Sequence, residues 1–76
     1  MKITVDENLV NSDKFLDMPK TTQLLYFFYL IDADANGIIV HPQTVLKANG
    51  LGADDYKLLL QKGFIGADGG EVWITE

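Results

Sequence analysis

The sequence predicts a small α+β domain that is mainly helical and ends in a β-hairpin. Three observations lead to this fold class. Residues 20–32 carry apolar side chains at helical spacing along their whole length. Two further helical patterns, residues 42–49 and 53–62, are separated by a short glycine-containing turn. Residues 64–75 contain two short strand patterns on either side of a glycine-rich turn.

Length and composition limit what this chain can be. Its 76 residues form one domain, residues 1–76, with a small core, and a hydrophobic content of 47% is typical of a folded chain. The absence of cysteine excludes disulfides and thiolate metal sites, and fits a reducing compartment. The longest apolar run, residues 24–31, is too short to span a bilayer, and the N-terminus lacks the apolar stretch of a signal peptide. We therefore expect a cytoplasmic protein without a membrane partner.

The charge balance bears on possible partners. The formal net charge is −5, and all six of the basic side chains are lysines. Proteins that bind nucleic acid draw much of their affinity from cations placed on phosphates, and arginine is the preferred bidentate reader of bases. The composition therefore argues against strong DNA binding by this domain alone.

The N-terminal part contains two weak patterns. Residues 2–5 have strand propensity. Ser12 can cap a short helical turn that carries Phe15 and Leu16, and Pro19 ends that turn.

The helix predicted over residues 20–32 is the strongest pattern in the chain, and Pro19 suits its first turn. Four apolar residues recur at the spacing i, i+3, i+4, i+7 and predict the face turned toward the core: Leu24, Phe27, Phe28 and Ile31. Other apolar residues cover most of the remaining circumference, among them Tyr26, Tyr29 and Leu30. A helix that is apolar nearly all round is either central in its fold or has a partner on its second side.

The middle of the chain contains a turn, a short strand and a second helix. Gly37 ends the long helical region, and the β-branched residues 38–40 favour a short strand. The helix over residues 42–49 begins at a proline, points Val45 and Leu46 inward and stops at Asn49-Gly50.

A third helix and a hairpin complete the chain. The helix over residues 53–62 has acidic residues in its first turn and Lys62 in its last, as the helix dipole favours, and Gly63 caps it. Its inward side is predicted to be Tyr56, Leu59 and Leu60. In the hairpin, residues 68–70 form the turn, and Val72 and Ile74 share the face opposite to Trp73.

This order of elements is that of a winged helix-turn-helix. Residues 49–53 form the turn, the helix over residues 53–62 occupies the recognition position, and residues 64–75 form the wing.

Residues 32–43 also match the first half of an EF-hand calcium loop. Asp32, Asp34 and Asn36 alternate before Gly37, as the ligands of such a loop do. However, the last ligand position, normally a bidentate glutamate, holds the neutral Gln43. The simpler interpretation is an acidic turn, in which Asp and Asn favour the bend and glycine allows positive φ. Calcium binding stays a minor alternative, and no metal or other cofactor is expected.

Several segments together resemble one protein family. They are S-D-K-F-L-D-M-P at residues 12–19, Q-L-L-Y-F-F-Y-L at 23–30, A-D-A-N-G at 33–37, Pro42, G-A-D-D at 52–55 and K-G-F-I at 62–65. Over about residues 11–65 the chain resembles the N-terminal winged-helix domain of phage and prophage replication initiators, the replisome-organiser and DnaD-like proteins of Gram-positive bacteria. The resemblance implies a role in DNA replication in the cytoplasm of a bacterial host cell. Family members continue into a basic tail, so this chain is either a stand-alone domain or the N-terminal domain of a longer protein.

Two surfaces are candidates for function. The recognition helix would point Asp54, Lys57, Leu58 and Gln61 outward. We therefore expect weak, salt-sensitive contact with DNA through four residues: Lys47, Lys57, Gln61 and Lys62.

The alternative is a protein-interaction or oligomerisation module on the same fold. Leu58 on the recognition helix suits a protein interface better than DNA. The second face of the long helix is rich in tyrosine, as interfaces are, unless it belongs to the core. The interface candidates are Tyr26, Tyr29, Leu30 and Leu58. A protein partner or self-association is expected on this interpretation.

Catalysis has no support in the sequence. His41 is the only histidine, and no nucleophile, P-loop or dinucleotide motif accompanies it. We therefore expect no catalytic residues and no enzymatic activity.

Overall fold

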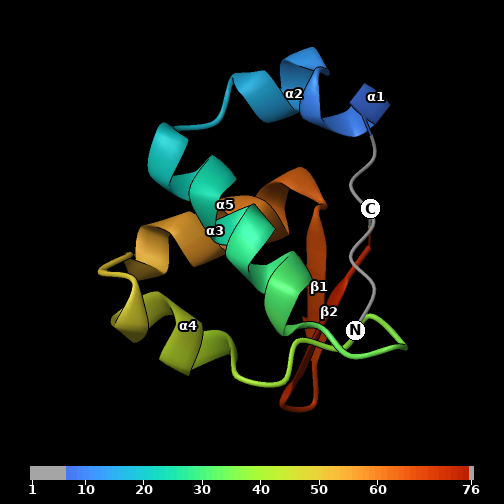
Figure 1. Ribbon diagram of the computed structural model, residues 1–76, viewed down its shortest axis with the longest axis vertical. Coiled ribbons are helices and arrows are strands. Elements are labelled where there is room, and N and C mark those ends of the chain that lie inside the picture. Colours follow the sequence, from blue (N-terminus) through green and yellow to red (C-terminus); the bar gives the residue numbers. More distant parts are fainter. Residues whose placement is uncertain (1–6, 76) are drawn as a thin grey trace.

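The computed structural model describes residues 7–75, and it has the mainly helical α+β fold with a C-terminal hairpin that the sequence predicts (Figure 1). The arrangement is that of a small winged helix. Its elements are α1 (Glu7–Val10), α2 (Asp13–Leu16), α3 (Lys20–Asp32), α4 (Pro42–Ala48), α5 (Ala53–Lys62), β1 (Ile65–Asp68) and β2 (Glu71–Ile74).

The helix α3 lies at the centre of the arrangement. It contacts both α4 and α5, and α5 leads directly into β1 and packs against it. The ranges predicted for α3 and α5 are confirmed, and α4 ends one residue before the predicted range, at Ala48. Asn49 ends α4 by donating from its side-chain amide to the Val45 carbonyl at 2.9 Å. Gly63 caps α5 with a φ of 81°, a left-handed conformation that favours glycine.

The N-terminal segment forms two short helical turns. Ser12 caps α2, because its hydroxyl accepts the Phe15 amide at 3.3 Å and donates to the Leu9 carbonyl at 2.6 Å. Phe15 is buried from this turn, whereas Leu16 is exposed. The helix α1 was not predicted, and the strand predicted over residues 2–5 lies outside the described residues.

The core is built on the side of α3 that carries Leu25, Tyr26 and Tyr29. Phe15 and Phe64 meet the Tyr26 ring edge-on, with centroids 5.6 Å and 5.4 Å away. Edge-to-face pairs of this kind are favourable because the positive edge of one ring meets the negative face of the other. The core continues through α4, α5 and the hairpin with Leu46, Leu59, Ile65 and Val72.

The predicted inward face of α3 is wrong. Leu24 is 46% exposed and Ile31 is 53% exposed, so the helix presents them to the outside. Because α3 is apolar nearly all round, its periodicity does not by itself select a face. The tyrosine side is the one on which α4 and α5 pack, and its burial leaves the Tyr29 hydroxyl satisfied, since this group donates to the Pro42 carbonyl at 2.9 Å.

The strand predicted over residues 38–40 is reduced to isolated bridges, one of Ile38 with Trp73 of β2 and one of Ile39 with Ala33. The Ile39 amide donates to the Val72 carbonyl, and the Ile74 amide donates to the Gly37 carbonyl, both at 2.8 Å. This short segment therefore covers one edge of β2, while β1 pairs with the other edge.

The hairpin turn is made by Gly69 and Gly70, with φ values of 57° and 87°. Positive φ at both central residues is the requirement of the type I′ turn that suits two-residue hairpin loops. Val72 is buried and Ile74 half-buried on the core side, while Trp73 lies on the opposite face, as predicted. There Trp73 faces its register partner Gly66 so closely that a Cβ atom at Gly66 would lie 2.6 Å from the indole ring.

The close contact between Gly66 and the Trp73 ring predicts that Gly66→Ala destabilises the domain. The new methyl group forces the indole or the hairpin backbone to move, which costs about 1–3 kcal/mol of unfolding free energy. Urea denaturation checks it, with Ala67→Ser as the control because Ala67 is exposed in the same strand. An unchanged midpoint for Gly66→Ala would contradict the packing described.

Candidate interaction surfaces

The recognition helix α5 is joined to α3 by a side-chain hydrogen-bond network. Asp55 Oδ1 accepts the hydroxyls of Thr22 at 2.7 Å and Thr21 at 2.8 Å, both from the first turn of α3. Its other oxygen, Oδ2, accepts the Gly52 amide at 3.2 Å at the start of α5. One carboxylate therefore sets the position of α5 against α3. The sequence predicts only that Asp55 is favourable in the first turn of a helix. It does not predict the hydrogen bonds to Thr21 and Thr22, because these residues are more than thirty positions away along the chain.

The same contacts change the acidity of Asp55. Partial burial alone would raise the pKa of this carboxyl, but the hydrogen bonds from Thr22, Thr21 and Gly52 favour the ionised form. The net result is a pKa below the ordinary value.

The outer side of α5 carries mixed chemistry. Asp54, Lys57 and Gln61 are exposed as predicted, while Leu58 is half-buried and packs against the core. Lys57 and Gln61 are one helical turn apart, and Asp54 lies one turn before Lys57. Lys62 is exposed, but it lies about 140° around the helix from Lys57 at 100° per residue. Lys47 is exposed on α4. The four predicted DNA contacts are accessible, yet the two lysines of α5 do not form one row.

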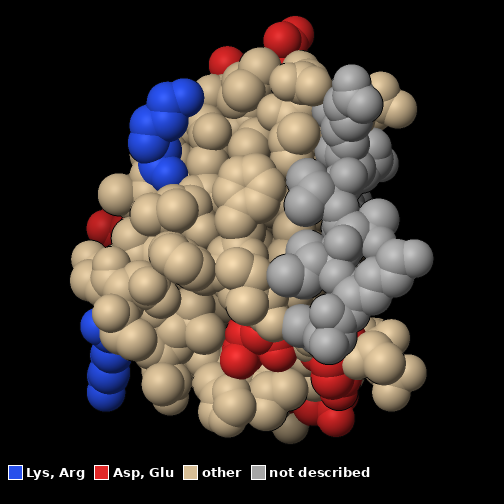
Figure 2. All heavy atoms as spheres, viewed as in Figure 1, with Lys and Arg blue, Asp and Glu red and all other residues tan. Residues whose placement is uncertain are grey.

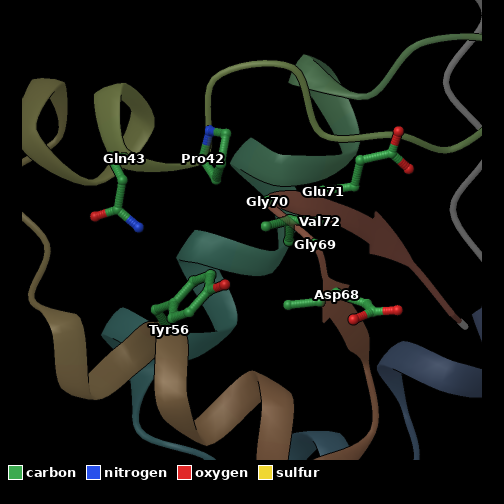
Figure 3. Close-up of a pocket in the computed structure, with 9 residues that line it drawn as sticks. Pro42, Gln43, Tyr56, Asp68, Gly69, Gly70, Glu71 and Val72 are labelled. Atoms are coloured by element: carbon green, nitrogen blue, oxygen red, sulfur yellow. The ribbon is translucent and has the colours of Figure 1, made fainter.

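An open pocket of about 420 Å³ lies between the start of α4, α5 and the wing (Figure 3). In the close-up, Gln43 and Tyr56 reach toward the space, whereas the carboxylates of Asp68 and Glu71 point away from it. The lining contains no lysine. The wing, residues 64–75, therefore carries two carboxylates and no lysine, where a DNA-binding wing would place cations.

The tyrosines predicted at a protein interface are not on the surface. Tyr26 is 2% exposed and Tyr29 is 0% exposed, so both belong to the core and the prediction is wrong for them. Leu30 and Leu58 are half-buried and pack against the core. Tyr26, Tyr29 and Leu30 are covered because α4 and α5 pack against α3 on the side that carries them.

The exposed apolar surface of α3 lies on the other side of the helix. We call it the α3 stripe, and it consists of Leu24, Phe27, Phe28 and Ile31. Phe27 and Phe28 are half-buried, and the Phe27 ring meets Phe15 and Tyr26 of the core edge-on, with centroids 5.7 Å and 6.1 Å away. Leu24 and Ile31 are exposed. Figure 2 shows the face that includes α3, where uncharged atoms cover the middle and charged side chains lie toward the edges. Sequence reasoning grouped the same four residues by their spacing but assigned them to the core.

The acidic turn after α3 uses its carboxylates for its own backbone. Asp34 Oδ1 accepts the amides of Asn36 at 2.8 Å and Ile38 at 3.0 Å. Asp32 Oδ2 accepts the His41 amide at 2.6 Å, and Oδ1 lies 3.0 Å from His41 Nδ1. Although burial would raise the pKa of Asp32, its contacts with His41 lower it below the ordinary value. Between residues 7 and 75 no three His, Cys, Asp or Glu side chains converge as a metal site would require.

Comparisons of the chain with protein-family models, with curated proteins and with solved structures find no match. Among the described helices, none has both the length and the apolar character needed to cross a membrane.

The Asp55 network predicts a specific pH dependence of stability. Asp55→Ala removes three hydrogen bonds and should cost about 1–2 kcal/mol at neutral pH. Because the folded-state pKa is lowered, this stabilisation is present above the unfolded value of about 4 and is lost as the pH falls through the folded value.

Thermal unfolding of wild-type and Asp55→Ala protein between neutral pH and the acid limit measures this difference. The two proteins should converge as the pH falls below about 4. Asp54→Ala is the matched control, since Asp54 is exposed in the same helical turn and carries the same charge. A difference that does not depend on pH would exclude the ionised carboxylate as its source.

Proposed function

We propose that this chain is a winged-helix domain of a phage-type replication initiator, and that it works mainly by assembling protein while contacting DNA only weakly. The resemblance described above supports the replication role, since its segments span α2 to the start of β1. The winged-helix order of α3, α4, α5 and the wing is consistent with it.

The observation that carries the assembly role is the exposed α3 stripe. Leu24 and Ile31 are each about half exposed, although burial of such side chains is favourable by roughly 25 cal/mol per Å². They line up along one helix side with Phe27 and Phe28 between them, rather than being scattered singly. Contiguous apolar surface of this kind is typical of protein interaction sites.

The DNA contact is the weaker part of the proposal. Lys57 and Gln61 are exposed on α5 in positions suited to base edges or phosphates. Asp54 on the same helix and the carboxylates of the wing oppose phosphate, and the net charge of the chain is −5. Electrostatic attraction to DNA is therefore limited to a few lysines.

Complementation tests the replication role and the α3 stripe together. The gene is deleted from the genetic element that encodes it, and the copy number of that element is measured by quantitative PCR. Deletion should reduce the copy number, and wild-type protein should restore it. Leu24→Ser combined with Ile31→Ser should fail to restore it, because both apolar contacts to a partner are removed.

The control for that experiment is a pair of polar substitutions away from the stripe, Thr44→Ser with Ala48→Ser, both exposed on α4. Circular dichroism of the purified variants establishes that each is folded. A copy number unaffected by deletion would refute the replication role, and full restoration by the Leu24→Ser, Ile31→Ser protein would refute the stripe as the working surface.

DNA binding is tested by fluorescence anisotropy of a labelled duplex at increasing salt. Binding should be detectable only at low ionic strength, with a slope of log K against log salt no steeper than about −3, because three lysines neutralise about three phosphates. Lys57→Glu with Lys62→Glu should abolish it. Lys20→Glu, compared with Lys57→Glu alone, is the control, since it changes the charge equally at an exposed position outside α5. Equal loss in both variants would assign the binding to net charge rather than to α5.

A further inference from the structure

We propose that the outer edge of β1 binds an extended segment of another protein, in which one apolar residue lies between two basic residues. The segment adds to the hairpin as an antiparallel strand beside Ala67. This inference goes beyond the proposed function, because it concerns the wing rather than the α3 stripe and does not depend on a role in replication.

The edge of β1 that faces away from β2 has open backbone groups at Ala67. Asp68 and Glu71 flank a two-residue loop and form a hydrogen-bonded pair, so Ala67 and Val72 form the next pair, which is not hydrogen-bonded. The Val72 carbonyl accordingly turns away from β1 and accepts the Ile39 amide. By the same alternation, the N–H and C=O groups of Ala67 turn away from β2.

These two groups of Ala67 have no hydrogen-bond partner within residues 7–75. Ala67 is exposed, whereas Ile65, the next residue turned to this edge, is only 2% exposed. Strand addition is therefore limited to the tip of the hairpin. There, one residue of an antiparallel segment can exchange both backbone hydrogen bonds with Ala67.

The core face of the hairpin tip borders the open pocket of about 420 Å³ (Figure 3). Ala67 and Val72 line it from the hairpin, Pro42 lines it from α4, and Tyr56 reaches toward the space from α5. Paired residues of neighbouring strands project their side chains to the same face of a sheet. A residue paired with Ala67 therefore directs its side chain toward this pocket, whose lining favours an apolar group.

The opposite face of the hairpin tip is acidic and aromatic. Asp68 and Glu71 are exposed register partners, and their carboxylates point away from the pocket. Trp73 lies over Gly66, where a Cβ atom would be 2.6 Å from the indole ring. In an added strand, the residue opposite Asp68 lies beside the two carboxylates, and the residue opposite Gly66 lies beside the indole. Both positions favour a cation, through ion pairing and through cation–π contact.

The two faces together specify the occupant as an apolar residue between two basic ones. A second copy of this chain does not supply this pattern through the same edge, since β1 reads I-G-A-D and carries no cation. Nucleic acid does not supply it either, because its phosphates repel the carboxylates of the wing. A basic segment of a different protein is also complementary to the net charge of −5.

Fluorescence titration tests the strand addition, because Trp73 is the only tryptophan of the chain. The probe is the synthetic peptide Thr-Lys-Val-Lys-Thr with acetylated and amidated ends. Its addition should change the Trp73 emission in a saturable manner, and absence of such a change up to millimolar peptide would overturn the proposal. A peptide with glutamate in place of both lysines should not bind, and equal binding of that peptide would also overturn it.

Methylation of single backbone nitrogens in the peptide tests the pairing itself. Methylation at valine removes the N–H that the Ala67 carbonyl accepts, so it should raise the dissociation constant at least tenfold. Methylation at the first lysine is the matched control and should have little effect, because that N–H turns away from β1. Equal affinity of the two methylated peptides would overturn antiparallel addition at Ala67.

Protein variants locate the site. Asp68→Asn should raise the dissociation constant at least threefold, whereas Asp17→Asn, an equal change of charge at an exposed position outside the wing, should leave it unchanged. Equal effects of both variants would assign the binding to net charge and overturn this edge as the site. Sedimentation of the protein alone tests the other occupant. Dimers that dissociate when the peptide is added would assign the edge to a second copy and overturn the proposal.

Discussion

The fold depends on the burial of one side of α3. Tyr29 and Leu25 are fully buried there, Tyr26 almost so, and every other described element except α1 contributes a buried apolar side chain to the same core. The hydroxyl of Tyr29 has a partner in the Pro42 carbonyl, so a large aromatic side chain is buried without an unsatisfied polar group. The opposite side of this apolar helix is less covered, and Leu24 and Ile31 stay about half exposed there. The exposed stripe is thus a direct consequence of how the core is built.

Polar side chains fix the parts that the core alone would leave free to shift. Asp55 holds α5 against the first turn of α3. Asp32 and Asp34 accept the backbone amides that shape the loop after the C-terminal end of α3. All three carboxylates accept hydrogen bonds from donors of the protein, which explains how acidic residues can be structural in a chain with a net charge of −5. The motif that resembles half a calcium loop is one of these structural turns.

Much of the fold could be predicted because its signals are local. The ranges of α3 and α5, the proline at the start of α4, the glycine after α5 and the double-glycine hairpin turn follow from periodicity, capping and turn chemistry. The candidate surfaces were predicted less well. The exposed Lys57 and Gln61 follow from the helical repeat once Leu59 is placed inward, but the orientation of α3 has no such internal marker, so Tyr26 and Tyr29 were assigned to the wrong side.

The sequence by itself determined which segments are helices, where they end and that a hairpin follows, because backbone conformation responds mainly to neighbouring residues. Only the tertiary structure decided which side of α3 is buried, which threonines bind Asp55, and that the segment after Gly37 pairs with β2 through an isolated bridge. Each of these depends on contacts between residues far apart in the chain. The exposed α3 stripe belongs to this second group: four apolar residues at regular spacing predict an amphipathic side, and the packing of α4 and α5 decides whether that side is buried or exposed.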